Sequence, residues 1–445
     1  MKVASLLVAL AVAVVAWAIG GSISGLLFKV APVPLACLAA ATFLWPQCLP
    51  GGSFAEARVR VRRSLRSDPL TWIALGLVVL LLIPLANVGL CWQCDAAQIA
   101  AGADPAPPVA WLPSCLRRRE HLSVAVSFLL ALSVMLAVRH GLAARGRRRF
   151  LDLLVWNGVA LAVLGVVQRA AHASGPLWLA SEGALQPWKF FSSFGYANFA
   201  AAYFTMMLCV ALALWAGDAV GKRRFGIPVR AFILYGAAVG TLSRTAIVLA
   251  TLAAAAGAVF ACVVLVRRIR AGMRGRCWRF LVVAGAVAAC IAAFALGDVR
   301  LEVSRLSPSA VSERLFDRIG CHRRAAIGLW KDNRVFGCGG WGYMHLCTMR
   351  MTAEERKRLQ MEGGAFVHND YLQFLCEHGV VGFGLMTVLV VALIRQFWGD
   401  WRCSPMAFFA VAGVFVVLLQ ALWDCPLRCP AVLMTLIGLA ATKQS

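Results

Sequence analysis

Charged residues are scarce in this sequence, and acidic ones are the scarcest. Asp, Glu, Lys and Arg together make up 14% of the 445 residues, whereas hydrophobic residues make up 61%. Soluble globular domains carry about 25% charged residues, so this composition excludes that class. Apolar runs of about 17 to 23 residues recur along the chain, and each is long enough to cross a hydrocarbon core roughly 30 Å thick. The sequence therefore predicts a polytopic membrane protein.

The apolar runs are continuous, without the weaker alternating pattern of a membrane β-barrel. Backbone groups in lipid must be paired within the spanning segment, so we predict an all-α bundle. The first run has no A-x-A-like cleavage site, which favours a spanning helix over a signal peptide. About twelve spans with both termini cytoplasmic are expected. They lie near residues 3–20, 31–46, 70–89, 122–139, 150–168, 197–216, 231–243, 246–266, 279–297, 379–397, 406–423 and 431–442.

This span order divides the chain into three parts. Residues 1–297 hold the first nine spans, and residues 379–445 hold the last three. Between them, residues 298–378 are polar and too long for a simple connection, so we expect a small, helical, extracytoplasmic subdomain there. The short span at 231–243 contains two glycines and a polar end, which favours a broken or re-entrant helix near a functional site.

The net charge is +24, from 44 basic and 20 acidic residues. The basic residues gather between spans on one side of the expected membrane, which is typical of cytoplasmic loops and argues against a nucleic-acid partner. Contact with anionic membrane lipids accounts for them. The four clusters are Arg58, Arg60, Arg62, Arg63 and Arg66; Arg139, Arg145, Arg147, Arg148 and Arg149; Lys222, Arg223, Arg224 and Arg230; and Arg267, Arg268, Arg270, Arg274, Arg276 and Arg279.

Several motifs are missing. The chain has no internal repeat, no low-complexity tract and no P-loop signature. The outer loops contain no carboxylate pair with convincing ligand spacing, so we predict no metal and no cofactor. The Cys91–Cys94 pair has redox-motif spacing but lacks a thioredoxin-like context. Eight cysteines are expected in an oxidising compartment with open pairing: Cys91, Cys94, Cys115, Cys321, Cys338, Cys347, Cys425 and Cys429.

The strongest local signal begins at His368, in the run HNDYLQFLCEHG. Asp370 and Gln373 have capping-box spacing, which predicts a helix start directly after His368. A helix N-terminus favours phosphate oxygens, and a neutral imidazole can accept a proton from a sugar hydroxyl. A hydrogen-bonded loop histidine is the structural alternative.

The second signal is Arg244, in the run GTLSRTA between two apolar segments. An ionisable group this close to the membrane must pair or face a cavity. Arginine binds phosphate in a bidentate manner, so a diphosphate is a natural ligand. A snorkelling interfacial arginine is the alternative. Two weaker regions are FGYANFAA around Asn198, which opens a span, and the glycine-rich turn DNRVFGCGGWG, which is favoured as a structural turn.

The order FGYANFAA, TLSRTA, DNRVFGCGGWG and HNDYLQFLCEHGVVGFG resembles the O-antigen ligase and Wzy polymerase superfamily over roughly residues 190–400. This resemblance implies a GT-C-like glycosyltransferase. Such an enzyme moves a glycan from an undecaprenyl-diphosphate carrier to an acceptor hydroxyl on lipid A core or another glycan, at the periplasmic face of a bacterial inner membrane.

The resemblance also implies site residues. Arg244 is expected to hold the diphosphate, and His368 to activate or orient the acceptor. The family uses an arginine of the long outer segment; Arg314, Arg318, Arg323 and Arg324 are candidates, with Arg314 favoured. The remaining substrate-binding candidates are Asn198, Ser243, Asn369, Asp370 and Tyr371.

The leaving diphosphate gains negative charge as the anomeric bond breaks, and arginines can stabilise it, so we expect metal-independent transfer. A ligase, a polymerase and a protein O-glycosylating enzyme need the same groups, and the sequence does not separate them. A transporter or flippase is the alternative function outside the enzymes. Such a protein is expected to show duplicated halves or ionisable residues at mid-membrane, and neither is evident in the sequence. A purely structural membrane subunit is the last alternative.

Overall fold

Helices make up the regular structure of the chain wherever it is described. The computed structural model describes residues 3–48, 51–89, 109, 111–179, 190–218, 226–270, 320–362, 366–396 and 404–442. Within these ranges, β-type pairing is limited to two isolated bridges, Val88–Cys115 and Phe191–Phe194. The predicted all-α class is therefore confirmed. The GT-C-like arrangement stays a prediction.

Six of the described helices are long and apolar enough to span a membrane. They are α5 (Pro69–Leu82, extended to Ala86), α7 (Arg118–Leu136, extended to Gly141), α8 (Ala144–Ala170), α9 (Ala197–Asp218), α11 (Arg244–Arg270) and α18 (Asp370–Arg395). If α2 (Ser24–Val30) and the run from α3 (Pro32–Ala39) to Leu44, which meet at 41°, form one span, there are seven. Shorter apolar helices are α1 (Val3–Trp17), α10 (Gly226–Gly240), α19 (Pro405–Gln420) and α20 (Pro430–Ala440). The chain is a multi-pass membrane protein.

The predicted spans fall on these apolar helices, apart from 279–297, which lies outside the described residues. The total of twelve stays a prediction, and two boundaries were wrong. The expected break within 231–243 is instead a turn at 241–243, because α10 runs unbroken through Gly236 and ends at Gly240. The span expected at 379–397 begins at Asp370, because the helical run continues through a kink at Gly379.

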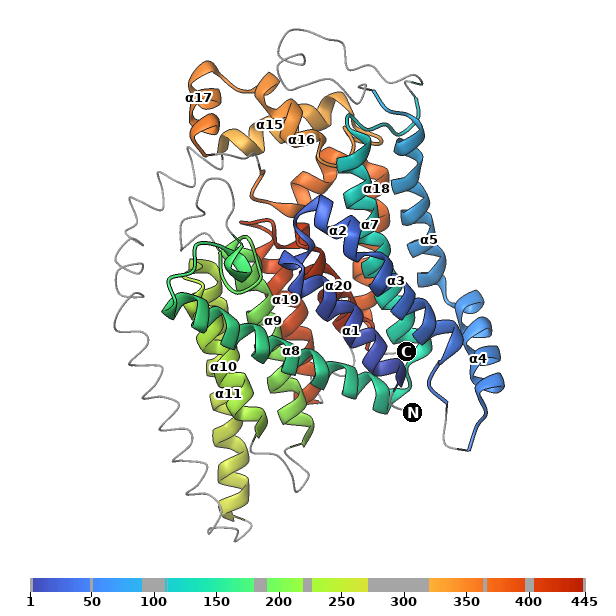
Figure 1. The fold of residues 1–445 in the computed structure, drawn as a ribbon, viewed down its shortest axis with the longest axis vertical. Helices are drawn as coiled ribbons and strands as arrows, with labels where there is room; N and C mark the ends of the chain where they lie inside the picture. Colours follow the sequence, from blue (N-terminus) through green and yellow to red (C-terminus); the bar gives the residue numbers. More distant parts are fainter. Residues whose placement is uncertain are drawn as a thin grey trace. The chain divides into compact units, whose positions relative to one another are not determined.

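The chain divides into two compact units. The first comprises residues 1–147, 309–396 and 418–445. In it, α1 packs against α3 and α20, α20 also packs against α7, and α5 packs against α7 and α18 (Figure 1). Helix α20 is buried along its whole length, so it forms the centre of this unit.

The second unit comprises residues 148–308 and 397–417. Its described core is α9, whose residues are buried almost throughout, and both α10 and α11 pack against it. Helix α8 approaches this core at Gly158, where an added Cβ would lie 3.0 Å from Leu234 and 3.2 Å from Met207. A small residue at that point therefore lets the helices pack closely.

Two arginines of the basic clusters are buried ion-pair partners, so their interpretation as lipid-facing anchors was wrong. Arg139 is 7% exposed and pairs with Asp68, the N-cap residue of α5. Arg230 is 5% exposed and donates to Asp152 at 2.7 Å. Because an unpaired buried charge is costly, each arginine depends on its carboxylate, and loss of one partner would destabilise the helix packing in that unit.

The glycine-rich turn binds the kink of α18 through its backbone. Gly339 N donates to Glu377 O at 2.8 Å, and Val380 N donates to Arg334 O at 2.9 Å. Gly379 has φ +61°, and a Cβ there would lie 2.2 Å from the carbonyl oxygen of Val335. The kink and the turn thus require glycine because the two backbones touch.

The described part of the predicted outer segment is helical. It contains α15 (Gly320–Asp332), α16 (Gly342–Leu346), a 3₁₀ turn (Cys347–Arg350) and α17 (Ala353–Glu362). Helix α15 packs against α18, and a buried cluster around Tyr343 and Leu329 joins them. The segment belongs to the first compact unit. Its extracytoplasmic position remains a prediction.

Candidate functional site

His368 lies two residues before the first residue of α18 and has a left-handed backbone, with φ +51°. A positive φ is uncommon for a residue with a side chain, and such strain persists where the surroundings fix it. The imidazole Nδ1 lies 3.7 Å from Asp424 Oδ1, and the side chain is 18% exposed. His368 is therefore held beside a carboxylate and still reaches the surface.

Asn369 caps α18: its Oδ1 accepts from Leu372 N at 2.9 Å. The predicted capping box at Asp370 was therefore wrong by one residue. Asp370 is 5% exposed, and its Oδ2 accepts from Leu427 N at 2.8 Å, while Gln373 Oε1 accepts from Val367 N at 3.3 Å. The Asp370 carboxylate thus binds the connection after α19 and leaves the capping position to its neighbour.

The connection 421–429 supplies the other side of the site. Cys425 follows Asp424 and is buried, and its thiol lies 3.5 Å from Asp424 Oδ1. Burial, reinforced by the Asp424 carboxylate, raises the pKa of the Cys425 thiol well above its usual range. The thiol is therefore protonated at neutral pH.

Helix α15 adds a cation and a second imidazole. Arg323 Nη2 donates to Leu422 O at 2.9 Å, and the same oxygen accepts from Asn369 Nδ2 at 3.2 Å. The His322 ring lies 6.2 Å from the His368 ring and is fixed by Tyr343, whose hydroxyl lies 2.8 Å from His322 Nδ1. Arg323 Nε is buried without a hydrogen-bond partner. We call His322, Arg323, His368, Asn369, Asp424 and Cys425 the His368 cluster.

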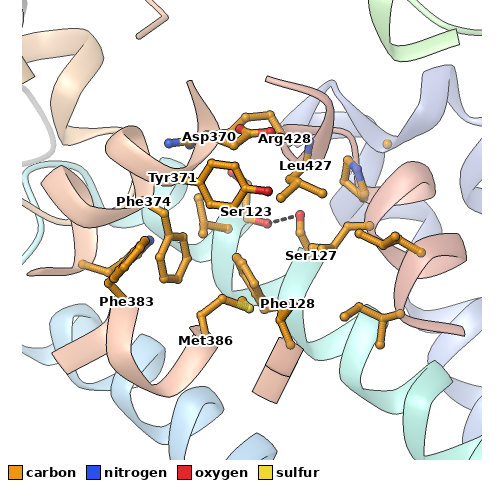
Figure 2. A pocket seen from close by; sticks show the side chains of 18 of the residues that line it. Ser123, Ser127, Phe128, Asp370, Tyr371, Phe374, Phe383, Met386, Leu427 and Arg428 are labelled. Atoms are coloured by element: carbon orange, nitrogen blue, oxygen red, sulfur yellow. Dashed lines mark hydrogen bonds between the residues drawn. The ribbon is translucent and has the colours of Figure 1, made fainter. Parts of the chain in front are cut away.

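A cavity of about 340 Å³ begins at the first turn of α18. Figure 2 shows Asp370, Tyr371 and Arg428 at its polar end, and Phe383 and Met386 on its apolar wall. The polar end of the cavity is therefore formed in part by Asp370 and Tyr371, the first two residues of α18, which follow His368 and Asn369 in the sequence. Its apolar end lies between α18 and α20.

The polar end of the cavity is fixed by a buried ion pair. Arg428 pairs with Glu377, whose side chain is 0% exposed, and stacks 5.1 Å from the Trp341 ring centre. Burial by itself lowers the pKa of Arg428, but Glu377 outweighs it, so the pKa lies above its ordinary value. Arg428 Nη1 and His378 Nε2 are buried without partners.

Residues 229–387 match the sequence profile of the family described as O-antigen ligase. This region of the chain is therefore similar to O-antigen ligases. The matched region includes Arg244, Arg323 and His368, whereas Asp424 lies beyond it. No curated protein matches the chain.

The predicted site residues fall into three groups. His368, Asn369, Asp370, Tyr371 and Arg323 lie in the first unit. Tyr371 donates to Leu418 O at 2.7 Å, which fixes the start of α18. Arg314 and Arg318 lie outside the described residues, and Arg324 pairs with Glu355 on the surface.

The third group lies in the second unit. Arg244 is the first residue of α11 and is half-buried. Ser243 is buried, and its carbonyl accepts from Ile247 N at 2.9 Å. Asn198, in the first turn of α9, donates to the Tyr196 hydroxyl at 2.8 Å. Arg244 thus stands at a helix N-terminus preceded by a turn in which Leu242 has φ +58°.

Sequence reasoning missed Asp424 and the Arg428–Glu377 pair. Asp424 is the last acidic residue of the chain and lies between two apolar segments. An isolated carboxylate in such a place is a recognisable signal, because ionisable residues near lipid are costly. Its partner, however, lies in a distant part of the sequence and cannot be read from local pattern.

Proposed function

We propose that the chain is a membrane glycosyltransferase that moves a glycan from undecaprenyl diphosphate to an acceptor hydroxyl, with O-antigen ligation as its reaction. The observation that carries this proposal is the His368–Asp424 pair just before α18. Arg323 lies beside this pair, because it donates to the same carbonyl oxygen, Leu422 O, as Asn369. His368 and Arg323 both fall within the residues that match the O-antigen ligase family. Members of that family act on a lipid-linked glycan donor and a glycan acceptor.

In the proposed reaction, His368 accepts the proton of the acceptor hydroxyl. Its Nδ1 faces Asp424, so the Nδ1–H tautomer is favoured and Nε2 keeps its lone pair. The acceptor oxygen forms a bond to the anomeric carbon, and the bond from that carbon to the diphosphate oxygen breaks. The electron pair leaves with the diphosphate, whose charge Arg323 stabilises. No metal takes part.

We assign the cavity beside the cluster to the lipid chain of a substrate. Its apolar wall suits a hydrocarbon chain, and its polar end lies at the helix start that carries His368. Met386→Trp is expected to fill the cavity and lower transfer. Val388→Trp, on the same helix but 52% exposed, is the matched control and should leave transfer unchanged.

The test is transfer from a polyprenyl-diphosphate glycan by the purified protein, with EDTA present throughout. His368→Ala is expected to lower the rate on the order of 10² to 10⁴-fold, the usual range for loss of a general base. Arg323→Gln should lower it about 10² to 10³-fold. Arg324→Gln changes the neighbouring, surface-paired arginine and should leave the rate within about twofold. Full activity of folded His368→Ala would refute the assignment, and loss of wild-type activity in EDTA would refute the metal-free mechanism.

Acceptor identity needs a second experiment. In a strain that lacks the protein, loss of all capped lipopolysaccharide supports a ligase, and capping with a single repeat unit supports a polymerase. Normal capping with loss of glycosylated protein points to a protein acceptor. A flippase would show no transfer in detergent solution, where no membrane separates donor from acceptor.

We place the protein in the bacterial inner membrane, with both termini cytoplasmic and the His368 cluster on the periplasmic side, following the basic clusters between spans. A reporter enzyme that is active only in the periplasm should be inactive when fused after Ser445 and active when inserted in the outer segment near Glu354. The opposite result would reverse the topology.

A further inference from the structure

Three potential metal ligands meet inside the His368 cluster. One ring nitrogen of His368, an Asp424 carboxylate oxygen and Cys425 Sγ all lie within 4.8 Å of one another. His, Asp and Cys are the side chains that bind Zn²⁺, with bonds of about 2.0 to 2.3 Å. Every member comes from a described segment of the first unit, and the three side chains need no movement between units to meet.

The spacing of these atoms fits one ion. In a tetrahedral site with such bonds, neighbouring ligand atoms lie about 3.3 to 3.7 Å apart. Here Asp424 Oδ1 lies 3.7 Å from His368 Nδ1 and 3.5 Å from Cys425 Sγ. The remaining pair, His368 and Cys425, lies within 4.8 Å, so the trio surrounds a cation after shifts of about 1 Å or less.

The surroundings hold two of the ligands in place. Cys425 N donates to Asp424 Oδ1 at 2.9 Å, and Asp424 N donates to Gln420 O at 3.0 Å. Outer hydrogen bonds of this kind orient metal-binding carboxylates. The partly exposed His368 provides the route from solvent.

We propose that His368, Asp424 and Cys425 form a regulatory site for a thiophilic divalent cation, with Zn²⁺ as the expected ion, and that binding there blocks glycan transfer. Three protein ligands leave the fourth position to water, which is typical of exchangeable rather than structural zinc. On binding, Cys425 releases its thiol proton to water, and the cation's charge stabilises the thiolate.

Metal binding and proton transfer compete for one imidazole. A neutral imidazole has a single lone pair, so coordination through Nδ1 places the proton on Nε2. Nε2 can then no longer accept the acceptor's proton. The binding part of this inference stands on geometry alone, whereas the inhibition rests on the proposed function.

The binding test uses Co²⁺ as a spectroscopic probe on the full-length protein, stripped with EDTA and then freed of chelator. Wild type is expected to develop a thiolate-to-cobalt charge-transfer band that Zn²⁺ abolishes. Cys425→Ser and His368→Ala should lose the band. Cys429→Ser is the control, because it removes a buried thiol of the same connection that contacts Gly20 O at 3.2 Å. This variant should keep the charge-transfer band.

The inhibition test measures transfer against free Zn²⁺. With each protein compared with its own metal-free rate, Cys425→Ser should need about 10 to 100-fold more Zn²⁺ than wild type for half-inhibition. An unchanged cobalt band or unchanged zinc sensitivity in Cys425→Ser would overturn the proposal. A band that behaves as expected in a protein without transfer activity would leave the metal site standing and refute the proposed function. If Cys425→Ser fails to fold, Cys425→Ala serves in its place.

Discussion

The buried pair of Glu377 and Arg428 makes a sharp test of what holds the start of α18. In the variant Arg428→Met, the Glu377 carboxylate keeps Gln373 as a hydrogen-bond donor at 3.1 Å but loses its cation. Its side chain is 0% exposed, so water cannot replace the guanidinium. Removing one partner of a buried pair costs about 3 to 5 kcal/mol, and the lost stacking of Arg428 on Trp341 adds about 0.5 kcal/mol or more.

The double variant Glu377→Leu with Arg428→Met removes both charges, and it should recover most of that loss, because an apolar pair of similar volume is often neutral or stabilising. The assay is thermal unfolding in detergent, with Arg428→Met expected to lower Tm by roughly 4 to 6 °C. Equal loss in the single and double variants would refute the reasoning, since it would show that packing, and not an unpaired carboxylate, determines the cost.

Three further predictions concern the backbone and the remaining ion pairs. Gly379→Ala should lower the free energy of unfolding by about 3 kcal/mol or more, because the added Cβ would meet backbone atoms at a residue with positive φ. The control is Gly384→Ala on the same helix, which has open space around it. It should be neutral or stabilise the protein by up to about 1 kcal/mol in the same unfolding assay. Asp68→Asn leaves buried Arg139 without its carboxylate and should cost about 3 kcal/mol, read from Tm. A backbone hydrogen bond from the start of α17 lowers the pKa of Glu355, so its stabilising effect is complete above the ordinary carboxyl pKa and is lost as pH falls through the lowered one. Hydrogen exchange should therefore show Glu355→Gln loosening α17 at pH 7 and having no effect at pH 2.

The helices were predictable because hydropathy is a local property of sequence. Continuous apolar runs placed every span that falls within the described residues, although the start of α18 was misplaced. In the sequence, Gly379 resembles a helix boundary. In the structure, backbone hydrogen bonds from the glycine-rich turn pair with groups on both sides of Gly379, so the helical run continues past the kink. Interactions between distant segments determined this outcome, and local pattern could not reveal them.

The candidate site was predictable in part for the same reason. His368 and Asn369 belong to one motif, and that motif indicated a helix start of unusual polarity. The choice between Asn369 and Asp370 as the cap depended on Leu427, which draws the Asp370 carboxylate away. Arg139 looked like a surface charge for a related reason, because its partner Asp68 lies far away in sequence.

The connection 421–429 belongs to the candidate site but lies beyond the residues that the family profile matches. Asp424 faces His368 before α18 begins, and Arg428 pairs with Glu377 two turns into that helix. One short connection therefore braces both ends of the polar stretch of α18 from outside the matched region. A chain that ended before this connection would retain the histidine and the arginines of the motif, but not the carboxylate that orients the imidazole or the cation that neutralises the buried Glu377. The connection between the last two apolar helices thus contributes to the proposed chemistry as well as linking two membrane segments.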